Sequence, residues 1–344
     1  MEAGHATGSA PARREGLAGL AKLDFGADGT PLQAKPALGA ALGLSGPFFV
    51  KRDDRAGMGM GGNKTRKLQY VVADALEGGA DVLITCGAVQ SNHACLTAVC
   101  GAAAGLEVHL VLAGDPSQMR GGNLVVDGLA AARLHFVAGD AWDVLVAESE
   151  RLAEDLRREG RRPYVIPVGA STPLGAVGYA DAYLELLGQL DAAGVTADWL
   201  VTACGSGGTQ AGLVAGRALA GRGPRVLGVD VSKGGGELRD VVAALAAGSL
   251  ELLGSDAAVP PDDVVLVDGA GPGYGQVFPE SREMVHSALR AAGLLLDPVY
   301  TSKAMAALPG LVGAGRIAAG DTVVFLHTGG LAALFAPAYE EALR

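Results

Sequence analysis

Apolar, strand-like runs alternate with longer helix-like stretches along most of this sequence, and that alternation constrains the fold more than any other feature. Strands are expected over 47–52, 82–85, 107–112, 134–137 and 164–168, and helices over 64–77, 91–104, 122–133 and 142–158. Strands that alternate with helices at this spacing form βαβ units, whose strands run parallel within one sheet. The pattern therefore predicts an α/β fold built on parallel sheets.

The loop at 169–175 is the best internal boundary, because the alternation restarts beyond it. Helices are expected over 179–190, 209–220, 280–292 and 303–312, from 237 and at the C-terminus, and strands over 199–202, 226–231, 264–267 and 322–326. We predict two Rossmann-like three-layer domains with a cleft between them. The small domain comprises 58–170, and the large domain comprises 1–57 and 171–344. Residues 1–30 are expected to wrap the surface or to fray.

Composition excludes several classes of function. Among 344 residues, 49% are hydrophobic and 53 are glycine, which suits helices packed closely on a sheet. The net charge of −10 comes without a basic stripe, so no nucleic-acid partner is expected. No apolar run reaches the length of a membrane span, and the N-terminus lacks a signal-peptide core. The four cysteines show no CxxC spacing, so we expect neither disulfides nor a metal site, and a cytoplasmic location.

The densest basic run of this acidic chain is Gly61-Gly62-Asn63-Lys64-Thr65-Arg66-Lys67-Leu68, at a predicted loop-to-helix junction. Asn63 is a suitable N-cap, which puts Lys64 in the first helical turn. The positive end of the helix dipole disfavours a cation there, and Lys67 on the same face adds to the pressure on Lys64 to lose its proton. Lys64 is therefore either solvated or used as a neutral amine.

A glycine-rich loop follows the strand at 199–202 and begins a helix, with the sequence Cys204-Gly205-Ser206-Gly207-Gly208-Thr209-Gln210. Its free backbone N–H groups can surround a phosphate at the helix N-terminus. No lysine stands in the Walker position, so this is not a nucleoside triphosphate loop. A dinucleotide site is the alternative, with Asp230 as the ribose-binding acid, although Gln210 replaces the third glycine of that pattern.

Other polar groups stand where strands end. Gln90-Ser91-Asn92-His93 begins a helix and suits a carboxylate, Tyr274 and Tyr300 lie in loops, and His327-Thr328-Gly329-Gly330 ends a buried strand. A lysine at a helix start, a phosphate loop, a carboxylate site and loop tyrosines together fit pyridoxal 5′-phosphate (PLP). Lys64 would form the Schiff base, and the amino-acid carboxylate would bind at 91–93.

The segments GGNKTRKLQY, QSNH, CGSGGTQAG, DPVYTSKAM and HTGG, in this order, resemble those of fold-type II PLP enzymes. More narrowly, they are similar to the group of D-cysteine desulfhydrase, 1-aminocyclopropane-1-carboxylate (ACC) deaminase and L-cysteate sulfo-lyase. The resemblance spans about 47–335. It implies a tryptophan synthase β-like fold, with PLP between the two domains of a homodimer.

The resemblance also implies residue roles. Lys64, Tyr274 and Tyr300 match the catalytic positions of the group. Cofactor contacts are implied for Lys64, Lys67, Asn92, Gly205, Ser206, Gly207, Gly208, Thr209, Thr301 and Thr328, and substrate contacts for Ser91, Asn92, His93, Tyr274 and Tyr300. ACC deaminases carry glutamate, leucine and glutamine where this chain has Thr301, Thr328 and His93, so all three positions favour the desulfhydrase type.

The expected activity is β-elimination from a small amino-acid substrate. D-cysteine, which would yield pyruvate, ammonia and hydrogen sulfide, is the first choice. L-cysteate, which would yield sulfite, comes next, and ACC deamination follows. Two readings from other classes remain: an NAD-dependent oxidoreductase that uses the 205–209 loop and Asp230, and a ligand-binding protein without turnover.

Overall fold

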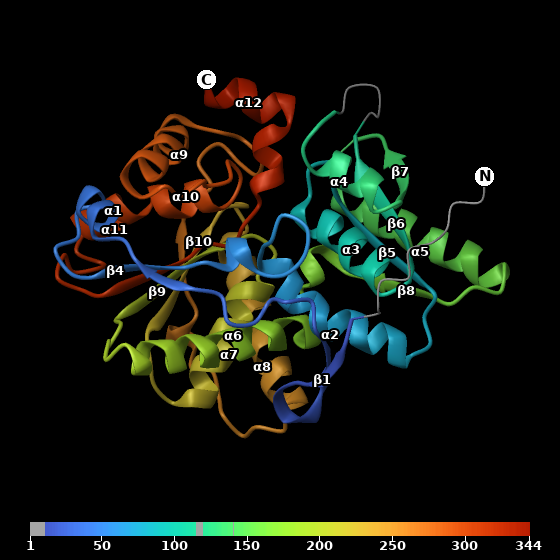
Figure 1. Ribbon diagram of the computed structural model, residues 1–344, viewed down its shortest axis with the longest axis horizontal. Helices are drawn as coiled ribbons and strands as arrows, with labels where there is room; N and C mark the ends of the chain where they lie inside the picture. The colour runs from blue at the N-terminus through green and yellow to red at the C-terminus, as the bar shows by residue number, and fades with distance from the viewer. Residues whose placement is uncertain (1–10, 115–119, 140) are drawn as a thin grey trace.

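The computed structural model describes residues 11–114, 120–139 and 141–344 and shows two lobes, each built on its own sheet (Figure 1). The larger sheet has the strand order β11-β10-β9-β12-β4-β3, and the smaller one has the order β7-β6-β5-β8. All neighbouring strands in both sheets run parallel except the antiparallel pair β3 and β4. The predicted α/β fold with parallel sheets is confirmed.

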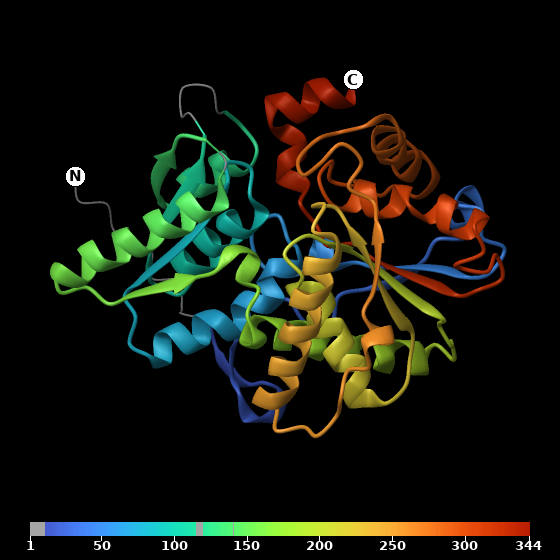
Figure 2. The same cartoon turned by 180° about the vertical axis from the view of Figure 1, so that it is seen from behind.

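The larger sheet carries helices on both faces (Figures 1 and 2). Its strands are β3 (Leu32–Ala34), β4 (Phe48–Lys51), β9 (Trp199–Cys204), β10 (Arg225–Asp230), β11 (Val265–Asp268) and β12 (Val323–Leu326). One face packs on α6 (Pro173–Ala192), α7 (Gly208–Ala220) and α8 (Gly235–Leu252), and the other on α1 (Pro36–Ala41), α9 (Pro279–Ala292), α10 (Thr301–Ala306) and α11 (Leu308–Gly313). Successive residues of β9 face opposite sides of the sheet, because Leu200 packs in the core beside α6, α7 and α8 and Val201 in the core beside α9 and α10.

The smaller sheet is also covered on both faces. Its strands are β5 (Val82–Ala88), β6 (Glu107–Ala113), β7 (Arg133–Val137) and β8 (Pro163–Ile166), and its helices are α2 (Asn63–Glu77), α3 (Asn92–Ala103), α4 (Asn123–Leu129) and α5 (Trp142–Arg158). Leu83 packs with α2 and α3, whereas Val82 and Ile84 pack with α5. We propose that 58–170 forms the small domain and that 1–57 with 171–344 forms the large one, because every strand of the smaller sheet falls inside the first range.

Several boundaries differ from the sequence predictions. Helix α4 ends at Leu129 rather than at 133, α6 begins at Pro173, where Thr172 caps it, and the helix expected over 303–312 is divided into α10 and α11. Pro309 accounts for the last difference, since proline supplies no N–H and is accepted only in the first turn of α11.

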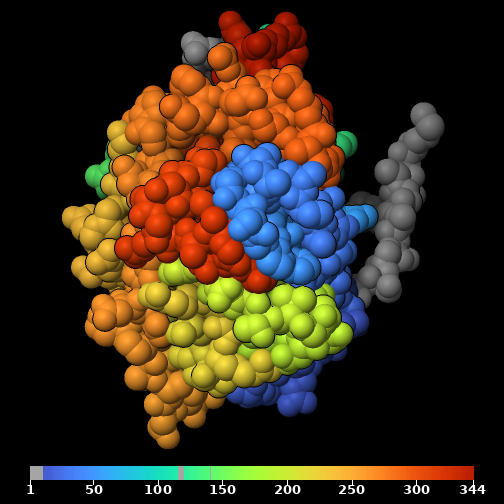
Figure 3. All heavy atoms as spheres, turned by 90° about the vertical axis from the view of Figure 1, so that its left-hand side faces the viewer, coloured from blue at the N-terminus to red at the C-terminus, as the bar shows by residue number. Residues whose placement is uncertain are grey.

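Residues 1–30 were expected to wrap the surface or to fray; residues 11–30 are ordered and partly buried, and residues 1–10 lie outside the described part of the chain. Strands β1 (Arg13–Glu15) and β2 (Ala21–Leu23) form a small antiparallel sheet, and Leu23 and Phe25 are buried in the small-domain core. Figure 3 shows α1, in blue, lying against the red C-terminal segments of the large domain. The N-terminal part of the chain thus joins both lobes.

Helix α2 lies between the two lobes and contacts α6 of the large domain as well as α3 of the small one. The approach to α6 is close at Gly178, where an added Cβ atom would lie 2.2 Å from the carbonyl oxygen of Arg66. Only glycine allows the backbones to meet there. No described helix is long and apolar enough to span a membrane.

Candidate active site

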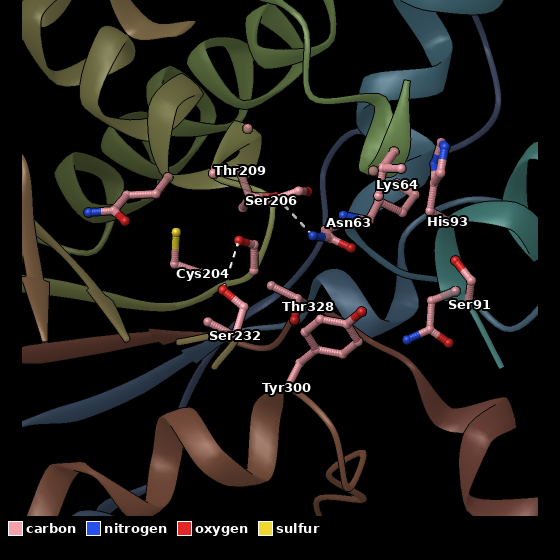
Figure 4. Close-up of a pocket in the computed structure, with 18 of the residues that line it drawn as sticks. Asn63, Lys64, Ser91, His93, Cys204, Ser206, Thr209, Ser232, Tyr300 and Thr328 are labelled. Carbon is pink, nitrogen blue, oxygen red and sulfur yellow. Dashed lines mark hydrogen bonds between the residues drawn. The ribbon is translucent and has the colours of Figure 1, made fainter. Parts of the chain in front are cut away.

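A cavity of about 430 Å³ lies between the two sheets and brings together the polar segments that the sequence singled out. Its lining includes Asn63, Lys64, Ser91, Asn92, His93, Trp142, Val168, Gly169, Ala203, Cys204, Gly205, Ser206, Gly207, Gly208, Thr209, Gln210, Ser232, Tyr274, Tyr300, Thr328 and Gly329. Ser91 and His93 enter from the small domain, and Cys204, Ser206 and Thr209 from the large domain (Figure 4). A cavity of this size and position accommodates a cofactor with a small substrate.

Lys64 is held at the start of α2 by a contact between two glycine segments. Gly62, with φ of 129°, is the N-cap in place of the expected Asn63, and it forms an antiparallel bridge with Gly329. Asn63 is instead the first helical residue, and its side-chain amide donates to Thr209 Oγ1 at 2.9 Å. Burial lowers the pKa of Lys64 to about 8, so the amine is readily available in its neutral form.

Lys67 lies one turn further along α2. Its Nζ donates to the carbonyl of Gly169 at 3.0 Å and lies 3.4 Å from Ser171 Oγ. Burial, and then the charge of Lys64, hold the pKa of Lys67 well below its usual range. Lys67 does not line the cavity directly, but a Cβ atom at Gly208 would lie only 2.6 Å from its Nζ. The Lys67 amine thus stands beside the glycine loop, where a bound anion would favour its protonated form.

The glycine loop turns into α7 at the opposite wall of the cavity. Gly207, with φ of 82°, is the N-cap, and α7 begins at Gly208. Ser206 Oγ lies 2.8 Å from Ser171 Oγ, which fixes the loop against the segment that precedes α6. The first N–H groups of a helix lack partners within it, so the start of α7 presents donors and a positive dipole end to the cavity. This is the geometry of a phosphate site.

The dinucleotide alternative lacks its acidic residue. The Asp230 carboxylate accepts hydrogen bonds from the backbone N–H groups of Ser232 and Gly235 and from the Ser232 hydroxyl. These donors hold the loop after β10, so Asp230 is already engaged. Gln210 donates to the carbonyl of Val265 and packs against the sheet, as a structural residue does.

The predicted carboxylate site forms the start of α3. Ser91 caps the helix, because its Oγ accepts the N–H of Ala94 at 3.2 Å, and its hydroxyl proton remains free to donate. Asn92 Oδ1 accepts the side-chain amide of Asn123 at 2.9 Å, and Asn123 also binds the backbone and side chain of Gln90. Oriented in this way, the Asn92 amide retains its own donors. The site suits a carboxylate or a ring oxygen.

His93 is held in one tautomer by the neighbouring strand. The Thr85 hydroxyl donates to the carbonyl of Ile166, so it accepts from His93 Nε2 at 2.8 Å. Nδ1 of His93 is then an acceptor, and it is buried without a partner among the described residues. Burial, followed by the charges of Lys64 and Lys67, holds the pKa of His93 well below its usual range. His93 is therefore neutral at physiological pH.

Two tyrosines complete the cavity. The hydroxyls of Tyr274 and Tyr300 are 2.6 Å apart, and their rings meet edge to face with centroids 5.9 Å apart. Burial raises the pKa of both phenols. Lys303 fixes the loop that carries Tyr274, since its buried Nζ donates to the carbonyls of Ala270 and Gly273 at 2.9 and 2.6 Å.

Thr301 departs from its expected place beside the cofactor. It is fully buried outside the cavity lining, where its hydroxyl donates to Asp297 Oδ1 at 2.6 Å and accepts the N–H of Asp297. The Asp297 carboxylate also accepts the backbone N–H groups of Val299, Tyr300 and Thr301, and these bonds hold Thr301 in place at the start of α10. Thr328 does line the cavity, as expected, and its carbonyl accepts the N–H of Asn63 at 3.0 Å.

Polar and aromatic residues of the site that were not predicted include Asn123, Ser171, Ser232 and Trp142. The first two act on predicted residues from distant segments, and nothing in their local sequence indicates this. Ser232 follows the end of β10, and Trp142 begins α5; the rule that parallel sheets bind ligands at strand ends would have pointed to Ser232.

Comparisons with known proteins agree with this site. Residues 23–329 match the family model described as pyridoxal-phosphate dependent enzyme. A protein of Pyrococcus abyssi is 39% identical over 307 residues, which cover 89% of this chain and 90% of that protein, and one of Pyrococcus horikoshii is 38% identical with the same coverage. Both carry the provisional name 1-aminocyclopropane-1-carboxylate deaminase.

A solved structure described as an ACC deaminase homologue has a TM-score of 0.86 and 36% identity, and covers 94% of this chain and 95% of that one. A threonine deaminase, 18% identical with a TM-score of 0.63, covers 88% of this chain and 92% of its own, and shows the shared fold. The chain belongs to the fold-type II PLP-dependent enzymes, within the group that includes ACC deaminase and D-cysteine desulfhydrase. It is a PLP-dependent lyase.

The residues present fit PLP. Lys64 lines the cavity and Lys67 is fully buried behind it, and no ion pair with a carboxylate holds either of them among the described residues. Gly208 leaves room that a side chain would fill, since an added Cβ atom would lie 2.7 Å from Ser171 Oγ and 2.6 Å from Lys67 Nζ. An amine for the aldehyde and a positively charged helix start for the phosphate are the groups that this cofactor needs.

Proposed function

We propose that this enzyme eliminates the β-substituent of a small amino acid, with D-cysteine as substrate and hydrogen sulfide, pyruvate and ammonia as products. The observation that carries the proposal is the charge of the cavity wall. Among the described lining residues, Lys64 is the only cationic side chain and none is a carboxylate. A thiol leaving group needs no charged partner, and such a wall suits it.

The position of each residue in the cavity suggests its role in the reaction. Lys64 would hold the cofactor and, as a neutral amine, take the Cα proton. The start of α7 with Lys67 would bind the phosphate, and Ser91 with Asn92 the substrate carboxylate. PLP, when bound, supplies an electron sink for the charge that develops at Cα. Tyr274 and Tyr300 stand where a hydroxyl can donate a proton to a departing sulfur.

The wall disfavours the two alternatives for different reasons. The sulfonate of L-cysteate calls for a cation, but Lys64 is committed to the cofactor and His93 is neutral. ACC deaminases of this group use a glutamate where Thr301 stands, and the described lining offers no carboxylate in its place. The names of the Pyrococcus relatives nevertheless make ACC deamination the second candidate.

A substrate panel tests the proposal directly. Purified holoenzyme is offered D-cysteine, L-cysteine, L-cysteate and ACC, and the pyruvate or 2-ketobutyrate, ammonia, sulfide and sulfite released are measured, with Lys64→Ala as the blank. We expect the highest kcat/KM for D-cysteine. Faster turnover of ACC would assign the enzyme as an ACC deaminase, and turnover of none of the four compounds would show that this lyase acts on another substrate.

We also propose that the enzyme is a homodimer, as the resemblance implies, and that it is cytoplasmic, as the cysteine pattern suggests. All four cysteines are buried and free, which is compatible with a reducing compartment. Light scattering on an eluting size-exclusion peak measures the oligomer, and a monomer mass would contradict the proposal. Fractionation of cells tests the location.

A further inference from the structure

Trp142 is a cavity residue to which the roles described above assign nothing. It is the first residue of α5 in the small domain, lines the cavity, and is still 44% exposed. A side chain that both lines a cavity and faces solvent lies at the mouth of that cavity. Trp142 therefore borders the opening through which a substrate passes.

Trp142 also completes an aromatic wall that crosses from one domain to the other. Its ring meets Tyr274 edge to face, with centroids 6.2 Å apart and an interplanar angle of 70°. Tyr274 makes the same kind of contact with Tyr300 deeper in the cavity. Edge-to-face contacts are the preferred geometry for aromatic pairs. The Trp142 ring and the Tyr274 loop thus support each other across the cleft.

In the proposed function, the cofactor phosphate and the substrate carboxylate are already assigned to other walls. The phosphate lies toward α7 and the carboxylate toward α3, so the β-substituent is left with the aromatic wall. Ring area there is apolar and fills space that a larger substituent would need. A substituent that extends toward the mouth meets the Trp142 ring first.

We propose that Trp142 is a specificity-determining residue that limits the β-substituent to small groups. This inference rests on the proposed β-elimination and deepens it. The reaction considered takes R–S–CH2–CH(NH2)–COOH and water to R–SH, pyruvate and ammonia: the Cα–H and Cβ–S bonds break, and the thiolate leaves with the electron pair and gains a proton. Trp142 excludes large R groups and leaves the thiol itself unhindered.

The test compares D-cysteine with S-benzyl-D-cysteine on holoenzyme, or the L forms if the panel selects that enantiomer. Trp142→Ala should raise the ratio of kcat/KM for the benzyl compound over that for cysteine by about tenfold or more, since pocket size discriminates by about 10–200-fold. Trp142→Phe, which retains a ring, should change the ratio by less than about threefold. An equal loss for both substrates in Trp142→Ala, or an unchanged ratio, would overturn the proposal.

Fluorescence gives a second readout that does not need turnover. The chain has two tryptophans, and Trp199 is buried in the large-domain core, so Trp199→Phe leaves Trp142 as the sole emitter. Emission should change when S-benzyl-D-cysteine binds, and change less with D-alanine. If no cysteine derivative is turned over, the proposed function fails, and Trp142→Ala should still strengthen binding of the benzyl compound relative to D-alanine. Emission that responds to neither ligand contradicts the role of Trp142.

Discussion

Helix α2 carries basic side chains on two faces, and the two faces differ in whether carboxylates pair with those side chains. Arg66 points away from the cavity, and its guanidinium donates to Asp53 at 2.8 Å and to Glu185 at 3.0 Å. Lys51 binds the same Glu185. These partners raise the pKa of Arg66 well above its usual value, whereas burial lowers the pKa of Lys64 and Lys67 on the cavity face.

The difference shows what each face is for. A buried charge whose partners satisfy its hydrogen bonds leaves no uncompensated charge in the fold, and removing one partner is strongly destabilising. A buried charge without an anionic partner costs free energy unless a ligand supplies that partner. Tyr179 strengthens the paired side by donating to Asp53 at 2.7 Å. We conclude that the Arg66 face anchors α2 to α6, and that the lysine face is complete only with a bound anionic cofactor.

The largest effect is expected on the cavity face. Lys64→Ala removes both the amine that holds PLP and the base, and proton transfer alone contributes about 10²–10⁴-fold to turnover. We expect activity to fall to the blank while the far-ultraviolet circular dichroism spectrum stays unchanged. Borohydride reduction followed by peptide mapping should label Lys64 in the unaltered enzyme. A label on Lys67 would mean that the two lysines exchange roles.

On the Arg66 face of α2, a substitution should lower the free energy of unfolding. Arg66→Met leaves the buried Asp53 carboxylate without its ion-pair partner and removes one of the two cations that bind the half-buried Glu185, and breaking a buried pair costs about 3–5 kcal/mol. The free energy of unfolding from urea titration, measured on apoenzyme, gives the value. The matched control is Arg151→Ala, which removes an ion pair at a 60% exposed side chain and should cost less than about 1 kcal/mol. Equal losses would show that the buried pairs are not an anchor.

Substitution of Lys67 should weaken PLP binding without lowering the stability of the apoenzyme. Lys67→Met should weaken PLP by about 1.5–3 kcal/mol, or about 10–150-fold in Kd, because a charge-assisted hydrogen bond to the phosphate is lost. The free energy of unfolding of the apoenzyme should stay equal or rise, since an unpaired buried charge disappears. Lys51→Met on the paired side should lower it. A Lys67 variant that destabilises the apoenzyme would show that Lys67 serves the fold.

The sequence predicted the features that depend on neighbouring residues and missed the contacts between residues far apart in the chain. Helix α2, the glycine loop of α7 and the cap at Ser91 follow from residues that lie next to each other, so their motifs were sufficient. Asn123 reaches Asn92 from 31 positions away, and no local signal marks that contact. Thr301 is a different case, because Asp297, which binds its hydroxyl, lies only four residues earlier in the same motif; its contact with the cofactor stays a prediction.

The smallest effect is a pH dependence on the cavity face of the apoenzyme. The pKa of Lys64 is about 8 in the folded chain and 10.5 in an ordinary lysine. Below pH 8 both folded and unfolded forms carry the proton, so the cost of burying the charge is fully present. Between about 8 and 10.5 only the unfolded form holds it, so this group makes the free energy of unfolding rise with pH.

The slope from one such group is at most about 1.4 kcal/mol per pH unit. Lys67 also contributes to the pH dependence of the free energy of unfolding in the alkaline range. The informative quantity is therefore the difference in this free energy between the unaltered apoenzyme and Lys64→Met, measured by urea unfolding at pH 7.5, 8.5 and 9.5. At low pH, Lys64→Met should be more stable than the unaltered apoenzyme, because it lacks the charge on Lys64. At high pH the unaltered apoenzyme has lost that charge too, so the difference should shrink as pH rises. A difference constant across this range would show that Lys64 is not buried as a cation, and the contrast between the two faces of α2 would then rest on Lys67 alone.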